Sequence, residues 1–367
     1  MAKDSGETLR WIRPGQKTAL VIIAALLGGF IGVVMTLSMV FVSSKAIFLD
    51  RVDKHGISSK TSSRLGGPLV CLGAVAFGLL LVAVEQKTLL LGLADSMRHL
   101  EGYLLVALVV GGIGLWEDYA ERLSPKLRLK LLFLTVGIYF IATASELPRD
   151  VFASEFLQFL NHPLIVGLSM TICVVGFINA GNIADGANGL LSTIAVVVFL
   201  VGYLETGAVL FNALLLSTFI FSLYNMLTGS LFLGDSGAYF LSALMAMTCV
   251  DLYIQGGSSV WFYACFLGYP CVELLRIMYL RWSVGQSLFS ADNNHFHNLL
   301  FEKLKSFGLS SQVGNTCTGF SIAAVSVAVP LLVYLINAIP LDSPGWMLIF
   351  VLYCLVHLSV GRYLSRK

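Results

Sequence analysis

Apolar and polar residues alternate along this chain in long blocks rather than in short periods. Eleven blocks are dominated by apolar residues, and they cover 18–42, 66–84, 102–116, 127–144, 163–179, 189–204, 208–227, 237–254, 259–280, 315–337 and 346–362. A helix needs about 20 apolar residues to cross a bilayer, and only helices or closed barrels satisfy their backbone in lipid. The blocks lack the two-residue alternation of barrel strands. We therefore predict an all-α polytopic membrane protein with about 10 to 11 transmembrane helices.

Two regions make the number of spans uncertain by one. The block 102–116 is short for a span, and the semi-apolar stretch 151–160 is compatible with a helix on the membrane surface. No internal repeat or low-complexity linker interrupts the chain. We expect residues 1–367 to form a single transmembrane domain.

Lys and Arg residues predict the orientation, because they are enriched in cytoplasmic connectors. The connectors after the first, third and ninth blocks and the C-terminal tail share one side and hold fifteen Lys and Arg residues, against three, Lys87, Arg98 and Arg149, on the other side. The richer side is expected to face the cytoplasm. The N-terminal tail, with Lys3, Arg10, Arg13 and Lys17, disagrees with this assignment in an eleven-span protein.

Composition supports the membrane interpretation and excludes other classes. The chain is 57% hydrophobic and only 12% charged, whereas soluble domains carry about 25% charged residues. The net charge of +2 gives no indication of a nucleic-acid partner. The seven cysteines lie in apolar runs without zinc-site spacing, so we interpret them as buried hydrophobic residues. The first apolar run is too long for a cleavable signal peptide.

The unusual polar sequences all fall in connectors of the predicted cytoplasmic side. They are Gly114–Asp118 with Lys126 beyond it, Asn179–Gly189, Phe232–Gly237 and Asp292–His297. Carboxylates flanked by glycines suit a hard cation such as Mg²⁺, which in turn suits phosphates. Four such connectors on one face of an apolar protein favour a shared site over four unrelated turns.

Each connector also has a simpler interpretation when it is considered alone. Glu117 and Asp118 could end a helix at the lipid headgroups, and Asp235 could form an Asx turn. A solvated turn also remains open for Asp185, although its amide-rich and glycine-rich surroundings favour a ligand site. A pair of histidines such as His295 and His297 is more often structural than catalytic, and its members share a side only in an extended segment.

At these residues the chain resembles the polyprenyl-phosphate N-acetylhexosamine-1-phosphate transferase superfamily. The ordered matches are the Gly-x-x-Asp-Asp motif and its continuation at 114–128, the amide-rich motif at 179–190, Phe-x-Gly-Asp-x-Gly at 232–237, and Pro270, Glu273 and Arg276 with the segment 289–297, which ends in the His-x-His signature. The chain departs from the family pattern at Glu117, Asn188 and Asn298. It also has serines in place of prolines around Arg64, Gly66 and Gly67. Asn188 resembles the O-antigen branch of the family more than the peptidoglycan branch.

The resemblance implies transfer of a sugar phosphate from a UDP-N-acetylhexosamine to undecaprenyl phosphate, with release of UMP. It implies Mg²⁺ as the cofactor, with Mn²⁺ as a substitute, held by Asp235 and Asp118. Asp118, Glu117, Asp185, His295 and His297 are the implied catalytic residues, and Arg64, Lys126, Asn179, Asn182 and Asn188 the implied substrate-binding residues. We expect Asp118 to deprotonate the lipid phosphate, and a covalent aspartyl phosphate is the rival route. Glu273 and Arg276 are expected to form a structural ion pair.

A carrier or flippase for sugars or lipid-linked intermediates is the competing function. Carriers gather polar groups near the bilayer midplane, often in repeated halves, and this chain gathers them at one surface without repeats. A purely structural subunit would not need four acidic, glycine-rich connectors. The residues do not identify the sugar. The resemblance implies that the protein lies in the bacterial inner membrane and begins the synthesis of O-antigen or another cell-envelope polysaccharide. A homodimer would also be consistent with the family.

Overall fold

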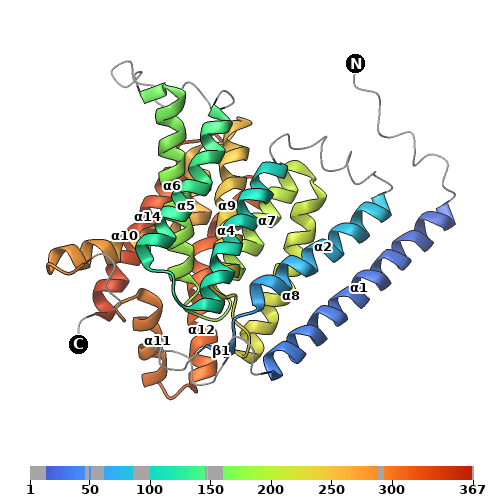
Figure 1. The fold of residues 1–367 in the computed structure, drawn as a ribbon, viewed down its shortest axis with the longest axis horizontal. Helices are drawn as coiled ribbons and strands as arrows, with labels where there is room; N and C mark the ends of the chain where they lie inside the picture. Colours follow the sequence, from blue (N-terminus) through green and yellow to red (C-terminus); the bar gives the residue numbers. More distant parts are fainter. Residues whose placement is uncertain are drawn as a thin grey trace.

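The structure is a computed structural model, and it describes residues 14–45, 49–50, 62–85, 100–144, 147, 160–287 and 293–365. These residues form a helical bundle (Figure 1) with one two-stranded sheet. The elements are α1 (Pro14–Ser44), β1 (Leu49–Asp50), β2 (Ser62–Ser63), α2 (Gly66–Glu85), α4 (Leu100–Ala120), α5 (Pro125–Ala142), α6 (Pro163–Ala184), α7 (Leu190–Thr206), α8 (Val209–Thr228), α9 (Gly234–Ile254), α10 (Val260–Ser283), α11 (Phe296–Ser306), α12 (Ser311–Ala323), η4 (Ala324–Ala328), α13 (Val329–Leu335) and α14 (Gly345–Leu364).

The predicted all-α membrane fold is confirmed. Every predicted span coincides with a helix, the tenth with the run formed by α12, η4 and α13. Among the described residues, nine helices are long and apolar enough to cross a membrane, and α7 is a shorter apolar helix. α5 begins with Lys126, Arg128 and Lys130, which dilute its apolar character.

Three sequence predictions need correction. The third span is not short, because α4 has 21 residues, so Glu117 and Asp118 belong to its last turn and not to a connector. The connector 281–314 contains a helix, α11, that the apolar pattern did not indicate. Cys173 is exposed on α6 and is not a buried residue. The predicted surface stretch 151–159, the basic residues Arg51, Lys54 and Lys60, and both ends of the chain fall outside the described residues.

α9 is the central helix of the bundle. In its most apolar stretch 83% of the residues are buried, against 11% in α1 and α14, which lie at the periphery. Small residues allow its neighbours to approach closely: a methyl group added at Gly67 of α2 would lie 2.4 Å from the backbone nitrogen of Gly237, and one at Gly114 of α4 would lie 2.3 Å from the carbonyl oxygen of Asp235. Membrane helices commonly use small residues for such packing.

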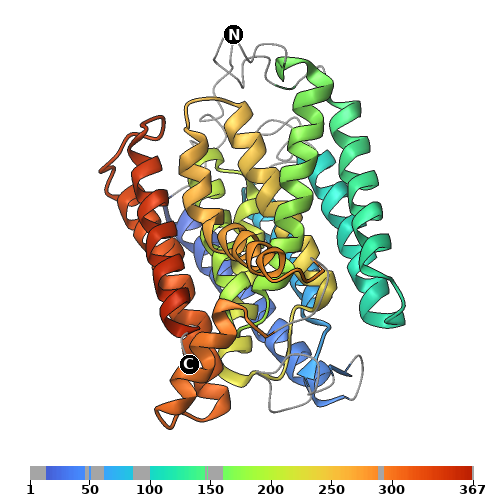
Figure 2. The same ribbon diagram turned by 90° about the vertical axis from the view of Figure 1, so that its left-hand side faces the viewer.

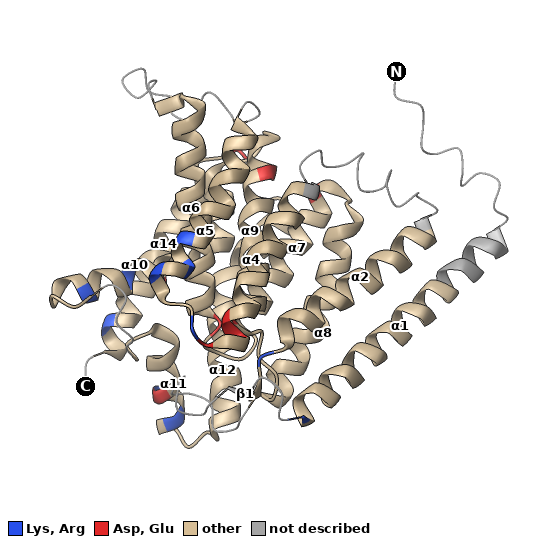
Figure 3. Cartoon of the chain, in the orientation of Figure 1, with Lys and Arg blue, Asp and Glu red and all other residues tan. Residues whose placement is uncertain are grey.

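The polar ends of the bundle collect on one side. α4 and α6 end, and α9 and α11 begin, at the lower end of the molecule in Figure 1. Most of the described Lys and Arg residues lie in the lower half of the same view (Figure 3). This asymmetry agrees with the predicted sharing of one face by the polar connectors. The assignment of that face to the cytoplasm stays a prediction.

The second half of α10 leaves the bundle. The helix contains Pro270, and its C-terminal half projects sideways from the other helices (Figures 1 and 2). A proline removes one backbone donor and crowds the preceding turn, which is a common cause of a helix bend. The bend leaves Arg276 and Glu273 close to the start of α11.

Candidate active site

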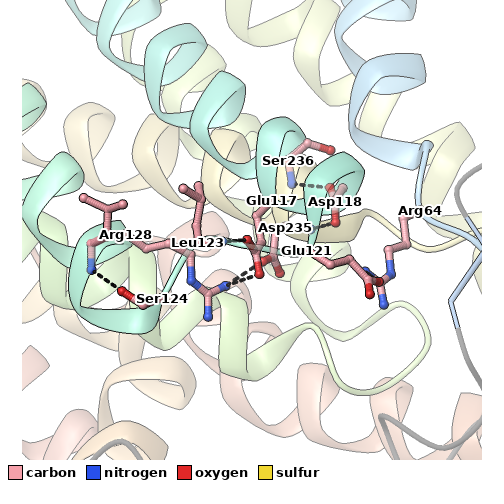
Figure 4. A network of polar contacts seen from close by, with 10 residues as sticks. Arg64, Glu117, Asp118, Glu121, Leu123, Ser124, Arg128, Asp235 and Ser236 are labelled. Atoms are coloured by element: carbon pink, nitrogen blue, oxygen red, sulfur yellow. Dashed lines mark hydrogen bonds and ion pairs between the residues drawn. The ribbon is translucent and has the colours of Figure 1, made fainter.

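The carboxylate of Asp118 joins the end of α4 to the start of α9. Its Oδ1 accepts a hydrogen bond from the backbone N–H of Asp235 at 3.0 Å, and its Oδ2 accepts one from Ser236 at 2.9 Å. The first N–H groups of a helix have no partner within the helix, and a carboxylate there also interacts favourably with the helix dipole. Asp118, only 6% exposed, thus caps α9 from a neighbouring helix (Figure 4).

Asp235 and Glu117 share one guanidinium group. The Nη1 atom of Arg128 is 2.8 Å from Oδ2 of Asp235 and 3.9 Å from Oε1 of Glu117 (Figure 4). The other oxygen of Glu117 accepts a hydrogen bond from the backbone N–H of Leu123 at 2.8 Å, which fixes the turn between α4 and α5. The sequence interpretation gave Arg128 no role in the site, although it is the last residue of the first motif.

Arg64 reaches the same region from the segment before α2. Its Nη1 atom is 3.3 Å from Oε1 of Glu121, directly after α4. The segment is fixed by backbone hydrogen bonds to the residues before α9, among them Gly66 N–H to the carbonyl oxygen of Phe232 at 2.9 Å. The same backbone hydrogen bonds therefore fix Arg64, before α2, next to the acidic residues at the start of α9.

Gly234 makes this close approach possible. Its φ of +71° lies in the left-handed region that favours glycine. A methyl group at this position would lie 2.5 Å from the carbonyl oxygen of Arg64 and 2.7 Å from Oδ2 of Asp118. Any side chain here would push apart the three segments that build the acidic cluster.

The amide-rich segment forms a second group at the end of α6. Asp185 is the C-cap residue of α6, Asn182 is partly exposed in its last turn, and Asn179 bonds back to the carbonyl oxygen of Val175 at 2.8 Å. Asn188 is 4% exposed, and its backbone N–H donates to Oδ1 of Asn315 at 2.8 Å. Asn188 therefore fastens this loop to α12.

The histidine pair approaches the amide-rich loop. The rings of His295 and His297 are stacked with centroids 5.4 Å apart. The pair shares a side although only His295, the extended N-cap residue, precedes the helix and His297 lies in the first turn of α11, so a fully extended segment is not needed. A methyl group at Gly186 would lie 2.2 Å from Nε2 of His297, so that ring rests against the residue that follows Asp185. Nδ1 of His297 and the hydroxyl of Tyr269 are 3.2 Å apart.

The predicted site residues thus fall into two groups at one end of the bundle. Glu117, Asp118 and Asp235 form the acidic cluster with Arg128, and Arg64 lies beside it, while Asp185 and the histidines meet at the end of α6. Lys126 is exposed in the first turn of α5, beside the acidic cluster in sequence.

The carboxylates of the acidic cluster are the residues of this region that could hold a divalent cation. Within the described part of the chain, no three His, Cys, Asp or Glu side chains are close enough to hold a metal by themselves. Glu117 and Asp235 pair with the single guanidinium of Arg128, and Asp118 accepts backbone N–H groups, so these contacts leave two of the three negative charges unbalanced. Mg²⁺ is usually bound by one or two carboxylates, water and substrate phosphates. Asp235, whose side chain is 24% exposed, is the accessible carboxylate of this set.

Comparison with known proteins gives one family and several bacterial relatives. The model of the family "Glycosyl transferase family 4" matches residues 100–253. A "probable undecaprenyl-phosphate N-acetylglucosaminyl 1-phosphate transferase" of Bacillus subtilis is 26% identical over 84% of this chain and 81% of its own length. An "undecaprenyl-phosphate alpha-N-acetylglucosaminyl 1-phosphate transferase" of Thermotoga maritima is 28% identical over 71% of this chain and 76% of its own. A "phospho-N-acetylmuramoyl-pentapeptide-transferase" of Streptococcus agalactiae is 24% identical over 66% and 76%.

Proposed function

We propose that this chain transfers N-acetylhexosamine 1-phosphate from a UDP-sugar to undecaprenyl phosphate. The premise is that the chain belongs to the polyprenyl-phosphate N-acetylhexosamine-1-phosphate transferase superfamily. An oxygen of the lipid phosphate forms a bond to the phosphorus that carries the sugar. The bond from that phosphorus to the bridging oxygen breaks, and UMP leaves with the electron pair. One phosphoanhydride replaces another, so catalysis rests on positioning and charge stabilisation.

The observation that carries the proposal is the acidic cluster at the start of α9. The guanidinium of Arg128 lies within 4 Å of a carboxylate oxygen of Glu117 and of one of Asp235. Two polyanionic substrates repel one another, and at an effective dielectric near 20 unit charges about 4 Å apart interact by about 4 kcal/mol. A site that brings them together needs cations at the reacting phosphates, and the cluster provides both a guanidinium and carboxylates for a divalent ion.

Asp235 is the primary metal ligand in this proposal, and Asp118 supports it. The hydrogen bonds from Asp235 and Ser236 to Asp118 fix the first turn of α9 and so the direction of the Asp235 side chain. Each carboxylate oxygen keeps a further lone pair, so capping leaves Asp118 able to contact a cation or to accept a proton from the lipid phosphate. A bound Mg²⁺ would neutralise charge that develops on the transferring phosphate.

The remaining site residues are assigned to substrate contacts. Arg64, next to Glu121, and Lys126, exposed in the first turn of α5, supply positive charge and would hold the pyrophosphate or the lipid phosphate. His295 and His297 add donors from α11, next to Asp185. Asn179 and Asn182 lie on the last turns of α6 and, with Asp185, would contact the nucleotide.

Asn188 is fastened to α12 and also keeps the substrate role that the resemblance implies. Its side chain is buried, and its Nδ2 donates to Thr316 at 3.3 Å. Its Oδ1 has no hydrogen-bond partner among the described residues, and this oxygen is the atom that we assign to the substrate.

Removal of divalent metal is expected to stop the reaction. EDTA should reduce UMP release to background, and excess Mg²⁺, or more weakly Mn²⁺, should restore it, because the two unbalanced carboxylates cannot themselves approach phosphates. The thermal unfolding midpoint with and without EDTA serves as the control for a structural metal. Transfer that continues at full rate in EDTA would contradict the metal assignment, and sugar movement without UMP release would support the carrier alternative.

The biological setting follows from the same reaction. We place the enzyme in the bacterial inner membrane with its site toward the cytoplasm, where UDP-sugars are made. The lipid diphosphate sugar would begin synthesis of O-antigen or another cell-envelope polysaccharide. The two N-acetylglucosaminyl transferases among the relatives make UDP-N-acetylglucosamine the first donor to test.

A further inference from the structure

A fully buried carboxylate, Glu273 on α10, lies behind the histidine segment. Its side chain is 0% exposed. Arg276 donates to it twice, from Nε to Oε2 and from Nη2 to Oε1, both at 2.8 Å. This confirms the ion pair that the spacing of the two residues predicts, but Arg276 accounts for only half of the donors around the carboxylate.

The other donors come from two different elements. The backbone N–H of Phe296, at the start of α11, donates to Oε1 at 2.9 Å. Nε2 of His357, on α14, lies 3.1 Å from Oε2. With the two bonds from Arg276, the carboxylate has four donors around it, close to the number of its lone-pair sites. Glu273 thus connects α10, α14 and the first residue of α11.

The same network reaches the two histidines of the site. Nδ1 of His295 lies 3.4 Å from Oε1 of Glu273, and Nη2 of Arg276 donates to the carbonyl oxygen of Asn294 at 2.6 Å. The rings of Phe296 and His357 are stacked with centroids 4.5 Å apart. The backbone on both sides of His295 is therefore held by the buried pair, and His297 follows one residue after Phe296.

We propose that Glu273 and His357 are positioning residues of the transfer reaction, which set the place of the His295 and His297 rings. The proposal rests on the proposed function, because it assigns these rings to substrate. His357 keeps the Glu273 carboxylate oriented, and the carboxylate in turn fixes the start of α11. With Nδ1 of His295 3.4 Å from Oε1 of Glu273, Nε2 lies on the side of the ring away from the buried pair. A lone His in an apolar helix such as α14 gives no sequence signal for this role.

Two substitutions of His357 separate hydrogen bonding from packing. His357→Gln keeps an N–H donor near the position of Nε2 but loses the ring, whereas His357→Phe keeps the ring against Phe296 but loses the donor. Both leave the Glu273–Arg276 pair intact, so no buried charge is left unpaired. If His357 positions the carboxylate by its hydrogen bond, His357→Gln keeps kcat within about threefold of wild type and His357→Phe lowers it about 10- to 100-fold.

The experiment measures kcat, donor KM and the thermal unfolding midpoint with undecaprenyl phosphate and the UDP-N-acetyl sugar that the wild type uses fastest. Trp346→Phe is the matched control, because Trp346 is a fully buried residue of α14 that packs against Phe262, away from the network. It should lower the unfolding midpoint without lowering kcat. In a His295→Ala background, His357→Phe should cost clearly less than its 10- to 100-fold effect in the wild type, because one of the two rings that His357 positions is already absent.

The outcomes distinguish a failure of the proposed function from a failure of the positioning role alone. A wild type that turns over no donor overturns the proposed function and this inference with it. An active wild type in which His357→Phe is active and His357→Gln is not would assign His357 to packing and overturn the inference alone. Independent, multiplicative losses from His295→Ala and His357→Phe would overturn it as well.

Discussion

An Asp235→Asn protein is expected to fold like the wild type and to lose at least about 100-fold of its transfer rate. The substitution keeps the size of the side chain and the backbone N–H that donates to Asp118. It removes the negative charge that pairs with Arg128 at 2.8 Å and that would hold the cation. Loss of one pre-organised charged or polar group in an active site typically costs about 10² to 10³ in rate.

Stability should change little in this variant. The side chains of Asp235 and Arg128 are 24% and 22% exposed, and partly exposed ion pairs contribute about 0 to 1 kcal/mol. Asp342→Asn, in the exposed turn before α14, is the matched control and should retain wild-type kcat. An Asp235→Asn enzyme with more than about one third of the wild-type rate would remove Asp235 from the catalytic machinery.

An Asp118→Asn protein is expected to lose both activity and stability. Asp118 is 6% exposed, and both of its oxygens accept backbone N–H groups of α9. An asparagine amide has one acceptor oxygen, so its NH₂ group would face an N–H donor of the helix. Hydrogen bonds to charged groups contribute about 1.5 to 3 kcal/mol, and we expect a loss of free energy of unfolding of about that size.

Asp235→Asn is the reference for this variant, because it should lose activity without losing stability. The thermal unfolding midpoints of the two variants, measured in the same detergent, should differ clearly even though both lack activity. An Asp118→Asn protein as stable as Asp235→Asn would show that Asp118 does not cap α9. An Asp118→Asn protein with wild-type activity would remove Asp118 from the catalytic machinery.

The apolar pattern was sufficient to predict the membrane helices, for a physical reason. A helix in lipid must cover its backbone and present apolar side chains over its whole length, so its position is a local property of the sequence. The same logic explains the errors. α4 extends past the apolar block because hydrogen bonds from α9 stabilise the carboxylate of Asp118 in its last turn. α11 was missed because it contains too few apolar residues to resemble a span.

The candidate site was predictable as a set of residues but not as an arrangement. The motifs indicated Asp118, Asp235, Asp185 and the histidines, because acidic, glycine-rich connectors are unusual in a membrane protein. That Asp118 caps a neighbouring helix depends on the contact of α4 with α9 at Gly114, which brings residues 117 positions apart together. The role of His357 depends similarly on the packing of α14 beside α10.

The measurement that tests the central claim most directly is the identification of the lipid product. Purified protein would be incubated with undecaprenyl phosphate, Mg²⁺ and a panel of UDP-N-acetyl sugars, and lipid-linked sugar and UMP would be followed by mass spectrometry. The proposed reaction predicts one undecaprenyl diphosphate sugar and one UMP per turnover, from at least one donor. No lipid-linked product from any donor, with folded protein that binds the lipid, would contradict the transferase function and favour a carrier.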